Sequence, residues 1–360
     1  PHRTEDYIVL KSLAEEYHLA MAYYYLGCLL YDRRVYDESI EDYEESILRS
    51  PDFPTVHRNL ALAYYNVKKL PQRAYEEMEK AFALDETDAR VYLELDQLKK
   101  RLNVAVKERW SDMEKHFDLV ESRDDLYLEY VTLLNTLGEP EKALGLIKAR
   151  KFHQWEGGEG KVAAQYLTAL YQLAKAAVEK EDYAEAKELL LRAVGEYPHN
   201  LGEGKLESGQ ENNLYYLLGL VQEKLGEAKD AFESLTRACC GESEPVGMMY
   251  YNDQPPEMIY YQGLAYRMLG EEEQAVRRFQ KLVDYGREHI RDDVKIDYFA
   301  VSLPDLLIFE ENLNERNRKH CLFMMSLGLK GLGRIDEAEK CAEELLAMDN
   351  AHQEIRVHDL

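Results

Sequence analysis

The residues best suited to chemistry lie in one glycine-rich stretch, residues 152–161, which reads FHQWEGGEGK. It places two carboxylates, Glu156 and Glu159, close to one of the chain's two tryptophans. Two acids roughly 5 to 10 Å apart are the groups that hydrolyse glycosidic bonds, so this pair is a candidate for that reaction. With 69 acidic residues in the chain, however, close acidic pairs arise by chance. The pair alone does not indicate an enzyme.

The same stretch has a second interpretation, as a loop that contacts a ligand. Its tryptophan offers an aromatic face, and the polar side chains around it could recognise a polyol or a charged group. Three glycines give the backbone freedom that an ordinary turn does not require. The candidate contact residues are His153, Trp155, Glu156, Glu159 and Lys161. The alternative is a structural plug between two blocks of helices.

Other motifs for chemistry are missing from the sequence. Gly160 and Lys161 lack the preceding glycine spacing of a phosphate-binding loop, and Val162 stands where that loop needs Ser or Thr. The sequence contains neither the HExxH motif of metalloproteases nor the GxSxG motif of serine hydrolases. Its ten histidines do not fall at metal-ligand spacing. We therefore expect no catalytic residue, no metal and no cofactor.

Tyrosine is the other informative residue type, with 27 copies in 360 residues. Adjacent tyrosines recur at 23–24, 64–65, 215–216 and 260–261. Neighbouring side chains on a helix point about 100° apart, so one ring can enter the core while the other faces a groove, where it suits a peptide or a sugar. The predicted groove residues are Tyr24, Tyr65, Tyr171, Tyr216 and Tyr260. Packing against the next helix is the alternative.

The elements that position these rings are paired helices. Apolar and small residues recur at helical spacing through most of the chain. The pattern breaks at short turns whose sequences are nearly the same. These turns lie at 137–140, 225–227, 269–271 and 332–334. In each, a glycine can end one helix in a left-handed cap, and a charged residue can begin the next helix.

This hairpin resembles the tetratricopeptide repeat, a unit of about 34 residues made of two antiparallel helices. Clear examples carry Tyr23, Leu26 and Gly27, and later Tyr215, Leu218 and Gly219. The resemblance implies an all-α fold, a right-handed superhelix or α-solenoid of about eight helical hairpins with loop insertions. In chaperone-binding members, basic and Asn side chains of the first helices hold a peptide's carboxylate. Only Asn59 fits that pattern here.

We expect a single helical-repeat array over residues 1–360, arranged in two blocks. Residues 1–151 form the N-terminal repeats and residues 162–360 the C-terminal repeats, joined by the glycine-rich segment 152–161. A long insertion interrupts the last repeats, and its apolar part, residues 297–309, is expected to be buried as a brace for the final repeat. Insertions in a solenoid often emerge on the binding face.

Composition limits the partners and the compartment. A formal charge of -24 repels phosphate backbones and anionic lipids, so we expect no nucleic acid. The longest uncharged run, residues 19–31, is shorter than the ~20 apolar residues that cross a membrane. Five cysteines without CxxC spacing indicate a reduced protein, which we expect in the cytoplasm. The chain begins at Pro1 with no leader, as a piece of a longer polypeptide would.

Two functions of different classes remain. The first is a non-catalytic scaffold that binds a protein or peptide segment, including a segment of its own parent chain. The second is an accessory module of a carbohydrate-active enzyme, in which the glycine-rich loop contacts sugar. It follows from a further resemblance: the insertions at 152–162 and 297–309 resemble the C-terminal repeat region of large uncharacterised bacterial proteins whose N-terminal part is β-rich and similar to carbohydrate enzymes.

Overall fold

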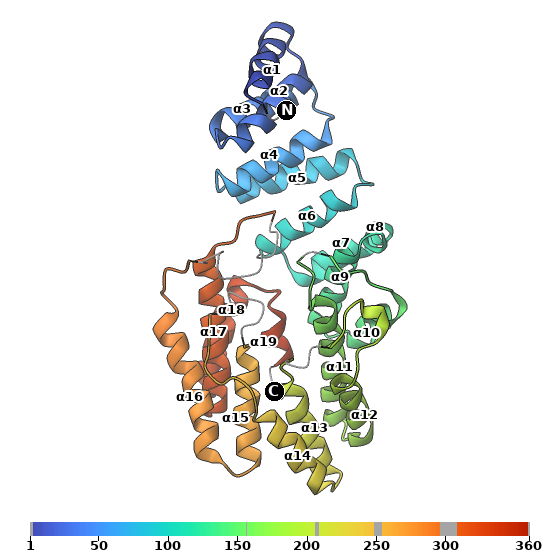
Figure 1. Ribbon diagram of the computed structural model, residues 1–360, viewed down its shortest axis with the longest axis vertical. Coiled ribbons are helices and arrows are strands. Elements are labelled where there is room, and N and C mark those ends of the chain that lie inside the picture. The colour runs from blue at the N-terminus through green and yellow to red at the C-terminus, as the bar shows by residue number, and fades with distance from the viewer. Residues whose placement is uncertain (1–2, 156, 206–208, 248–253, 296–307, 359–360) are drawn as a thin grey trace. The chain divides into compact units, whose positions relative to one another are not determined.

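The computed structural model describes residues 3–155, 157–205, 209–247, 254–295 and 308–358 (Figure 1). In these ranges the chain forms nineteen α-helices and one short 3-10 helix, and it has no strand. The expected all-α fold of helical hairpins is confirmed. None of the described helices is both long and apolar enough to cross a bilayer.

The described helices belong to two compact units. Unit 1 contains residues 3–104, 111–126 and 308–311, and unit 2 contains residues 105–110, 127–295 and 312–358, apart from the gaps given above. These units are defined by spatial contact, whereas the blocks 1–151 and 162–360 are defined by repeats. The division into blocks therefore stays a prediction.

Unit 1 is a short stack of hairpins. Its helices are α1 (Thr4–Tyr17), α2 (Ala20–Asp32), α3 (Tyr36–Arg49), α4 (Pro54–Asn66), α5 (Pro71–Leu84), α6 (Ala89–Arg101) and α8 (Phe117–Ser122). Helix α2 packs on α3, α4 packs on α5, and α3 packs on α4, so that each hairpin buries the apolar face of its neighbour. Helices α7 (Val106–Lys115) and α9 (Asp124–Thr136) contribute residues to both units.

Unit 2 continues the pattern with four hairpins and a short last helix. Its helices are α10 (Pro140–Ala149), α11 (Lys161–Glu179), α12 (Tyr183–Val194), α13 (Asn212–Lys224), α14 (Ala228–Ala238), α15 (Pro256–Met268), α16 (Glu272–His289), α17 (Leu313–Gly331), α18 (Ile335–Met348) and α19 (Gln353–Val357). The pairs α11 and α12, α13 and α14, α15 and α16, and α17 and α18 pack together. A 3-10 turn, His199–Leu201, follows α12.

Close approach within a hairpin depends on a glycine facing a large side chain. A Cβ added to Gly27 would lie 2.7 Å from the ring of Tyr43, and one added to Gly263 would lie 2.5 Å from the ring of Phe279. Gly331 of α17 approaches the same Phe279 ring even more closely by this measure. These distances are shorter than any carbon contact. The small residue of the repeated sequence phrase is therefore a packing requirement.

The turns between helices take the left-handed conformation that the sequence predicts. Gly138, Gly226, Gly270 and Gly333 have φ angles between 75° and 83°, where a glycine meets no Cβ penalty. The same role falls to non-glycine residues in other hairpins, including Arg34, Lys69 and Glu181. Those turns lack the glycine signal, so the sequence pattern marks only part of the hairpins.

We predict that Gly263→Ala destabilises the protein. The new methyl group must push the fully buried Phe279 ring out of its place, and overpacking of this kind costs about 1–3 kcal/mol. That cost exceeds the gain in helix propensity of up to about 1 kcal/mol. A lower midpoint of urea unfolding would show the effect.

Gly145→Ala is the matched control, because Gly145 lies inside α10 with nothing within 4 Å of an added Cβ. We expect this variant to be as stable as the parent chain or more so. Equal midpoints for both variants would contradict the packing role of Gly263.

Candidate functional site

Helix α4 has two faces of different character. Its buried face includes Val56, His57, Leu60, Ala61 and Tyr64, which pack into the core of unit 1. A second set of side chains, half-buried and recurring at helical spacing, forms a surface that we call the α4 face. This surface is mainly polar and aromatic, with one leucine near its middle. It consists of Arg58, Asn59, Leu62, Tyr65 and Asn66.

Residues 308–310 of the same chain lie against the C-terminal end of the α4 face. The Asn66 side chain binds their main chain twice: its Nδ2 donates to the carbonyl of Ile308, and its Oδ1 accepts from the amide of Glu310, both at 2.9 Å. Arg101 of α6 donates to the carbonyl of Phe309, also at 2.9 Å. Three main-chain groups of a short segment are thus held by two side chains.

The side chain of Phe309 completes the contact. It is 1% exposed, and its ring meets the ring of Tyr65 edge-on, with centroids 5.1 Å apart and an interplanar angle of 71°. The guanidinium of Arg101 lies 5.8 Å from the centroid of the Tyr65 ring. Edge-on aromatic pairs and cations near ring faces are both favourable. We call Tyr65, Asn66, Lys69 and Arg101 the Asn66 site.

Charge at the edge of the Asn66 site favours an acidic residue after the phenylalanine. Lys69 pairs with Glu310 at 2.6 Å, although both side chains are 65% exposed and the pair contributes little to stability. Tyr31 of α2 lies near the same carboxylate. Burial raises the pKa of the Tyr31 hydroxyl, a hydrogen bond with Asn66 opposes that rise, and Tyr36 and Glu310 add to it.

The described part of the predicted brace, residues 308 and 309, contacts unit 1. Phe309 is buried as expected, and its partners include Tyr65 and Arg101. Bracing of the final repeat by residues 297–309 stays a prediction. Residues 297–307 lie outside the described residues.

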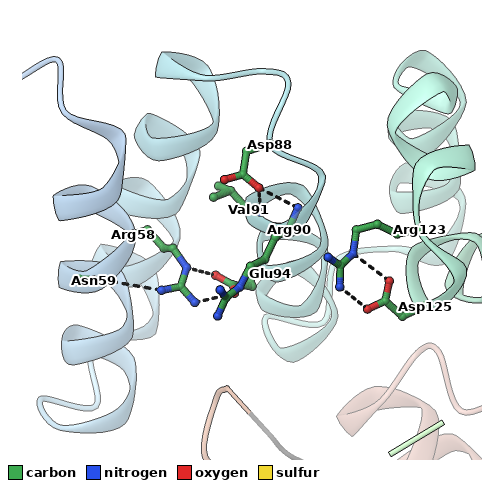
Figure 2. Close-up of polar contacts among 8 residues, drawn as sticks. All are labelled: Arg58, Asn59, Asp88, Arg90, Val91, Glu94, Arg123 and Asp125. Carbon is green, nitrogen blue, oxygen red and sulfur yellow. Dashed lines mark hydrogen bonds and ion pairs between the residues drawn. The ribbon is translucent and has the colours of Figure 1, made fainter. Parts of the chain in front are cut away.

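A charged cluster occupies the N-terminal half of the α4 face (Figure 2). Glu94 of α6 is fully buried and receives two hydrogen bonds from Arg58, at 2.6 and 2.7 Å, and one from Arg90 at 3.1 Å. Asn59 accepts from Arg58 at 3.1 Å and contacts the sulfur of Cys28. The bidentate Arg58–Glu94 pair links α4 to α6, so it holds together the two helices that carry the Asn66 site.

The predicted groove tyrosines of unit 1 are both half-buried. Tyr24 packs edge-on against Phe53, with ring centroids 5.0 Å apart, and burial followed by the nearby Cys28 raises its pKa to about 12. Tyr65 belongs to the Asn66 site. Asn66 itself was not predicted, although a sequence signal existed: it lies two helical turns after Asn59 and so on the same face of α4.

The three groove tyrosines predicted in unit 2 surround one buried ring, that of Tyr261. Tyr171 is 1% exposed and its hydroxyl lies 2.6 Å from the Tyr261 hydroxyl. Tyr260 is 3% exposed, and Tyr216 is half-buried with its ring centroid 5.5 Å from that of Tyr261. Ligand contact by these residues remains a prediction. At Tyr171 and Tyr260 a ligand would have to displace packed side chains.

Helix α19 lies among the helices of unit 2 (Figure 1). His358, directly after it, packs against the rings of Tyr171 and Tyr261, with centroids 5.6 and 5.5 Å apart. Gln353 donates to the carbonyl of Thr132 and the hydroxyl of Thr136, both at 3.2 Å. Lys175 donates to the carbonyl of Val357 at 2.9 Å. His358 contacts the hydroxyl of Tyr261 at 3.0 Å, and burial lowers its pKa to about 3.

The residues of the glycine-rich loop lie apart from the Asn66 site in sequence and belong to unit 2. Trp155 is half-buried over Gly158, where an added Cβ would clash with the indole. His153, Glu159 and Lys161 are exposed. Glu156 lies outside the described residues. Sugar contact by this loop remains a prediction.

A carboxylate that sequence reasoning missed holds the end of this loop. Glu203 accepts from the amide of Gly160 at 2.7 Å and from the amide of Ala163 at 2.9 Å. It therefore satisfies free amides at the start of α11, where the helix dipole favours negative charge. In the described residues, no three His, Cys, Asp or Glu side chains are grouped so that they could hold a metal ion.

Models of the tetratricopeptide repeat family match three stretches of the chain, residues 24–89, 171–245 and 257–285. The first stretch contains Tyr65 and Asn66, and the others contain the rings around Tyr261. The chain therefore contains tetratricopeptide repeats, as the repeated hairpin indicates.

Solved structures with similar repeats have low identity to this chain. YrrB, a TPR protein with an unusual peptide-binding site, is 18% identical, with 51% of this chain and 89% of that chain covered and a TM-score of 0.38. A tetratricopeptide repeat protein from Parabacteroides merdae is 13% identical, with 77% of this chain and 92% of that chain covered and a TM-score of 0.40. Naa15/Naa10 bound to HypK-THB is 9% identical, with 96% of this chain and 61% of that chain covered and a TM-score of 0.41.

We predict that Glu94→Ala destabilises unit 1. The substitution leaves Arg58 and Arg90 without their shared carboxylate, and we expect a loss of about 2–4 kcal/mol, near the lower end for a broken buried pair because Arg58 keeps some access to water. Urea unfolding followed by circular dichroism measures it. Lys68→Ala, which removes an exposed pair with Asp37, should cost less than about 1 kcal/mol; equal losses would rule out the linking role of Glu94.

We predict that His358 makes the stability of the folded protein depend on pH in the acid range. Its pKa of about 3 in the folded protein lies below the ordinary value of 6.5, so below about pH 6.5 the unfolded chain binds a proton that the folded chain does not. Stability is therefore lost as the pH falls from about 6.5 toward 3, by up to about 1.4 kcal/mol per pH unit. Burial raises the pKa of Glu257 to about 8, which acts in the opposite sense.

The difference in unfolding free energy between the parent chain and His358→Gln isolates the histidine from Glu257. We expect that difference to change steadily between pH 6 and pH 4. His153→Gln, at an exposed position, provides the control. Parallel stability curves for the parent chain and His358→Gln would show that the histidine is not buried in its neutral form.

Proposed function

We propose that this protein is a non-catalytic interaction module that binds a short non-helical segment of a partner protein at the Asn66 site. The observation that carries the proposal is the pair of hydrogen bonds between the Asn66 side chain and the main chain of residues 308–310. The amide of Asn66 accepts from Glu310 and donates to Ile308, two residues before it, and so holds a bent, non-helical backbone. It does so without regard to side-chain identity.

The buried phenylalanine ring against Tyr65 supplies the anchor that main-chain recognition lacks. Burying a phenylalanine side chain contributes about 1.5–3 kcal/mol, and each of the three hydrogen bonds to the main chain contributes about 0.5–1.5 kcal/mol. Part of this gain is offset by the entropy lost when a free segment is ordered. Three residues alone therefore bind weakly. A partner with useful affinity must extend along the α4 face toward Asn59 and Arg58.

The neighbouring charges suit a protein ligand better than a phosphate or a nucleic acid. Arg58 is neutralised by the fully buried Glu94, which leaves Arg101 and Lys69 as the cations beside the bound segment. Both contact groups that a peptide provides, a carbonyl and a carboxylate. No step of covalent chemistry is needed for this role.

A binding experiment tests the proposal. The probe is a fluorescein-labelled peptide with the sequence of residues 304–314, PDLLIFEENLN, and the receptor is the full chain carrying Phe309→Ala, which removes the chain's own anchor. We expect saturable binding by fluorescence anisotropy. Adding Asn66→Ala should weaken it about tenfold or more, which corresponds to about 1.4 kcal/mol, because two hydrogen bonds are lost.

Asn59→Ala in the same receptor is the control, since Asn59 lies on the same helix but contacts Arg58 and Cys28. We expect that variant to bind nearly as tightly as the receptor without it. Absence of saturable binding, or an equal effect of the two asparagine substitutions, would contradict the proposed site.

A further inference from the structure

We infer that residues 308–310 act as an intrachain competitor for the Asn66 site, and that the partner segment carries an aromatic residue followed by an acidic one. The inference rests on the proposed function and adds its regulation and its partner class. In the structure the site is filled by the chain itself, so a partner can bind only after residues 308–310 leave.

The position of the segment in the chain supports this role. It belongs to the connector between α16, which ends at His289, and α17, which begins at Leu313. These helices pack directly against each other, and the links between successive hairpins of unit 1, residues 50–53 and 85–88, need only four residues. Joining the two hairpins therefore does not require residues 308–310, whereas filling the Asn66 site does.

The contacts of the segment are those that a separate peptide could make. They comprise main-chain groups of residues 308–310, the ring of Phe309 and the carboxylate of Glu310. In contrast to a core helix such as α4, the segment presents one fully buried ring and no amphipathic face. The segment is therefore bound to the site by a few local contacts.

Tethering explains how so small a contact keeps the site filled. A tethered segment has an effective concentration of order millimolar near its site, so a three-residue contact with a dissociation constant of about 0.1 mM in trans would still be occupied about nine times in ten. A free partner then binds about tenfold more weakly than it would to an empty site. Removing the tethered contact should therefore make a free partner bind about tenfold more tightly.

The side chains of the segment define the partner class. Phe309 is enclosed beside Tyr65, which requires an aromatic residue at this position. Glu310 follows and meets Lys69, so an acidic residue is preferred next. Main-chain recognition by Asn66 and Arg101 leaves the preceding residue less restricted.

The experiment measures one peptide against several receptors, all made as the full chain. The labelled peptide of residues 304–314 is titrated into the parent chain, Phe309→Ala and Glu310→Pro. The proline variant lacks the N–H group that donates a hydrogen bond to the Asn66 side chain, but it keeps the aromatic ring. It therefore replaces Phe309→Ala if that variant folds poorly. Phe232→Ala, which removes a 62% exposed ring of α14, is the matched control.

We expect Phe309→Ala and Glu310→Pro to bind the peptide about tenfold more tightly than the parent chain, with Phe232→Ala equal to the parent. In the peptide, Phe309→Ala should abolish binding, and Glu310→Lys should weaken it most at low ionic strength.

The outcomes separate the inference from the proposed function. Equal affinity for the parent chain and both variants would overturn self-competition and leave the proposed function standing. Tighter binding that does not depend on Asn66 would overturn the inference, because the peptide would lie elsewhere. Absence of saturable binding to every receptor would overturn both.

Discussion

The described structure depends on how closely two helices of a hairpin approach each other. Glycines such as Gly27 and Gly263 let the backbone of one helix meet a ring on the next, Tyr43 and Phe279. A hairpin built in this way cannot bury its outer faces alone, so each one stacks on its neighbours. The stacking leaves one face of α4 half-buried. On α4 that face carries the Asn66 site.

Each unit places a segment of its own chain against its helices. In unit 1, residues 308–310 are held through their main chain by Asn66 and Arg101. In unit 2, α19 is held by the side chain of Gln353, and His358 after it packs against two tyrosine rings. The first contact is short and depends on backbone groups, whereas the second contributes to a core. This difference in chemistry separates a replaceable occupant from a structural element.

The helical fold and its turns could be predicted because they depend on neighbours in sequence. Gly138, Gly226, Gly270 and Gly333 take the expected left-handed conformation, since a turn is decided by local backbone preference. The site could not be predicted in the same way. Phe309 meets Tyr65 from the far end of the sequence, and Tyr171 packs against His358, almost 190 residues later in the chain. Periodicity shows that a residue lies on a face, but it does not show what covers that face.

The central claim is that the Asn66 site recognises the main chain of a short non-helical segment, whichever chain supplies it. The most direct test is a crystal structure of the Phe309→Ala variant with the peptide of residues 304–314. The claim predicts the peptide's phenylalanine ring against Tyr65 and two hydrogen bonds between its main chain and the Asn66 side chain. A peptide bound elsewhere, or bound in a helical conformation, would contradict it.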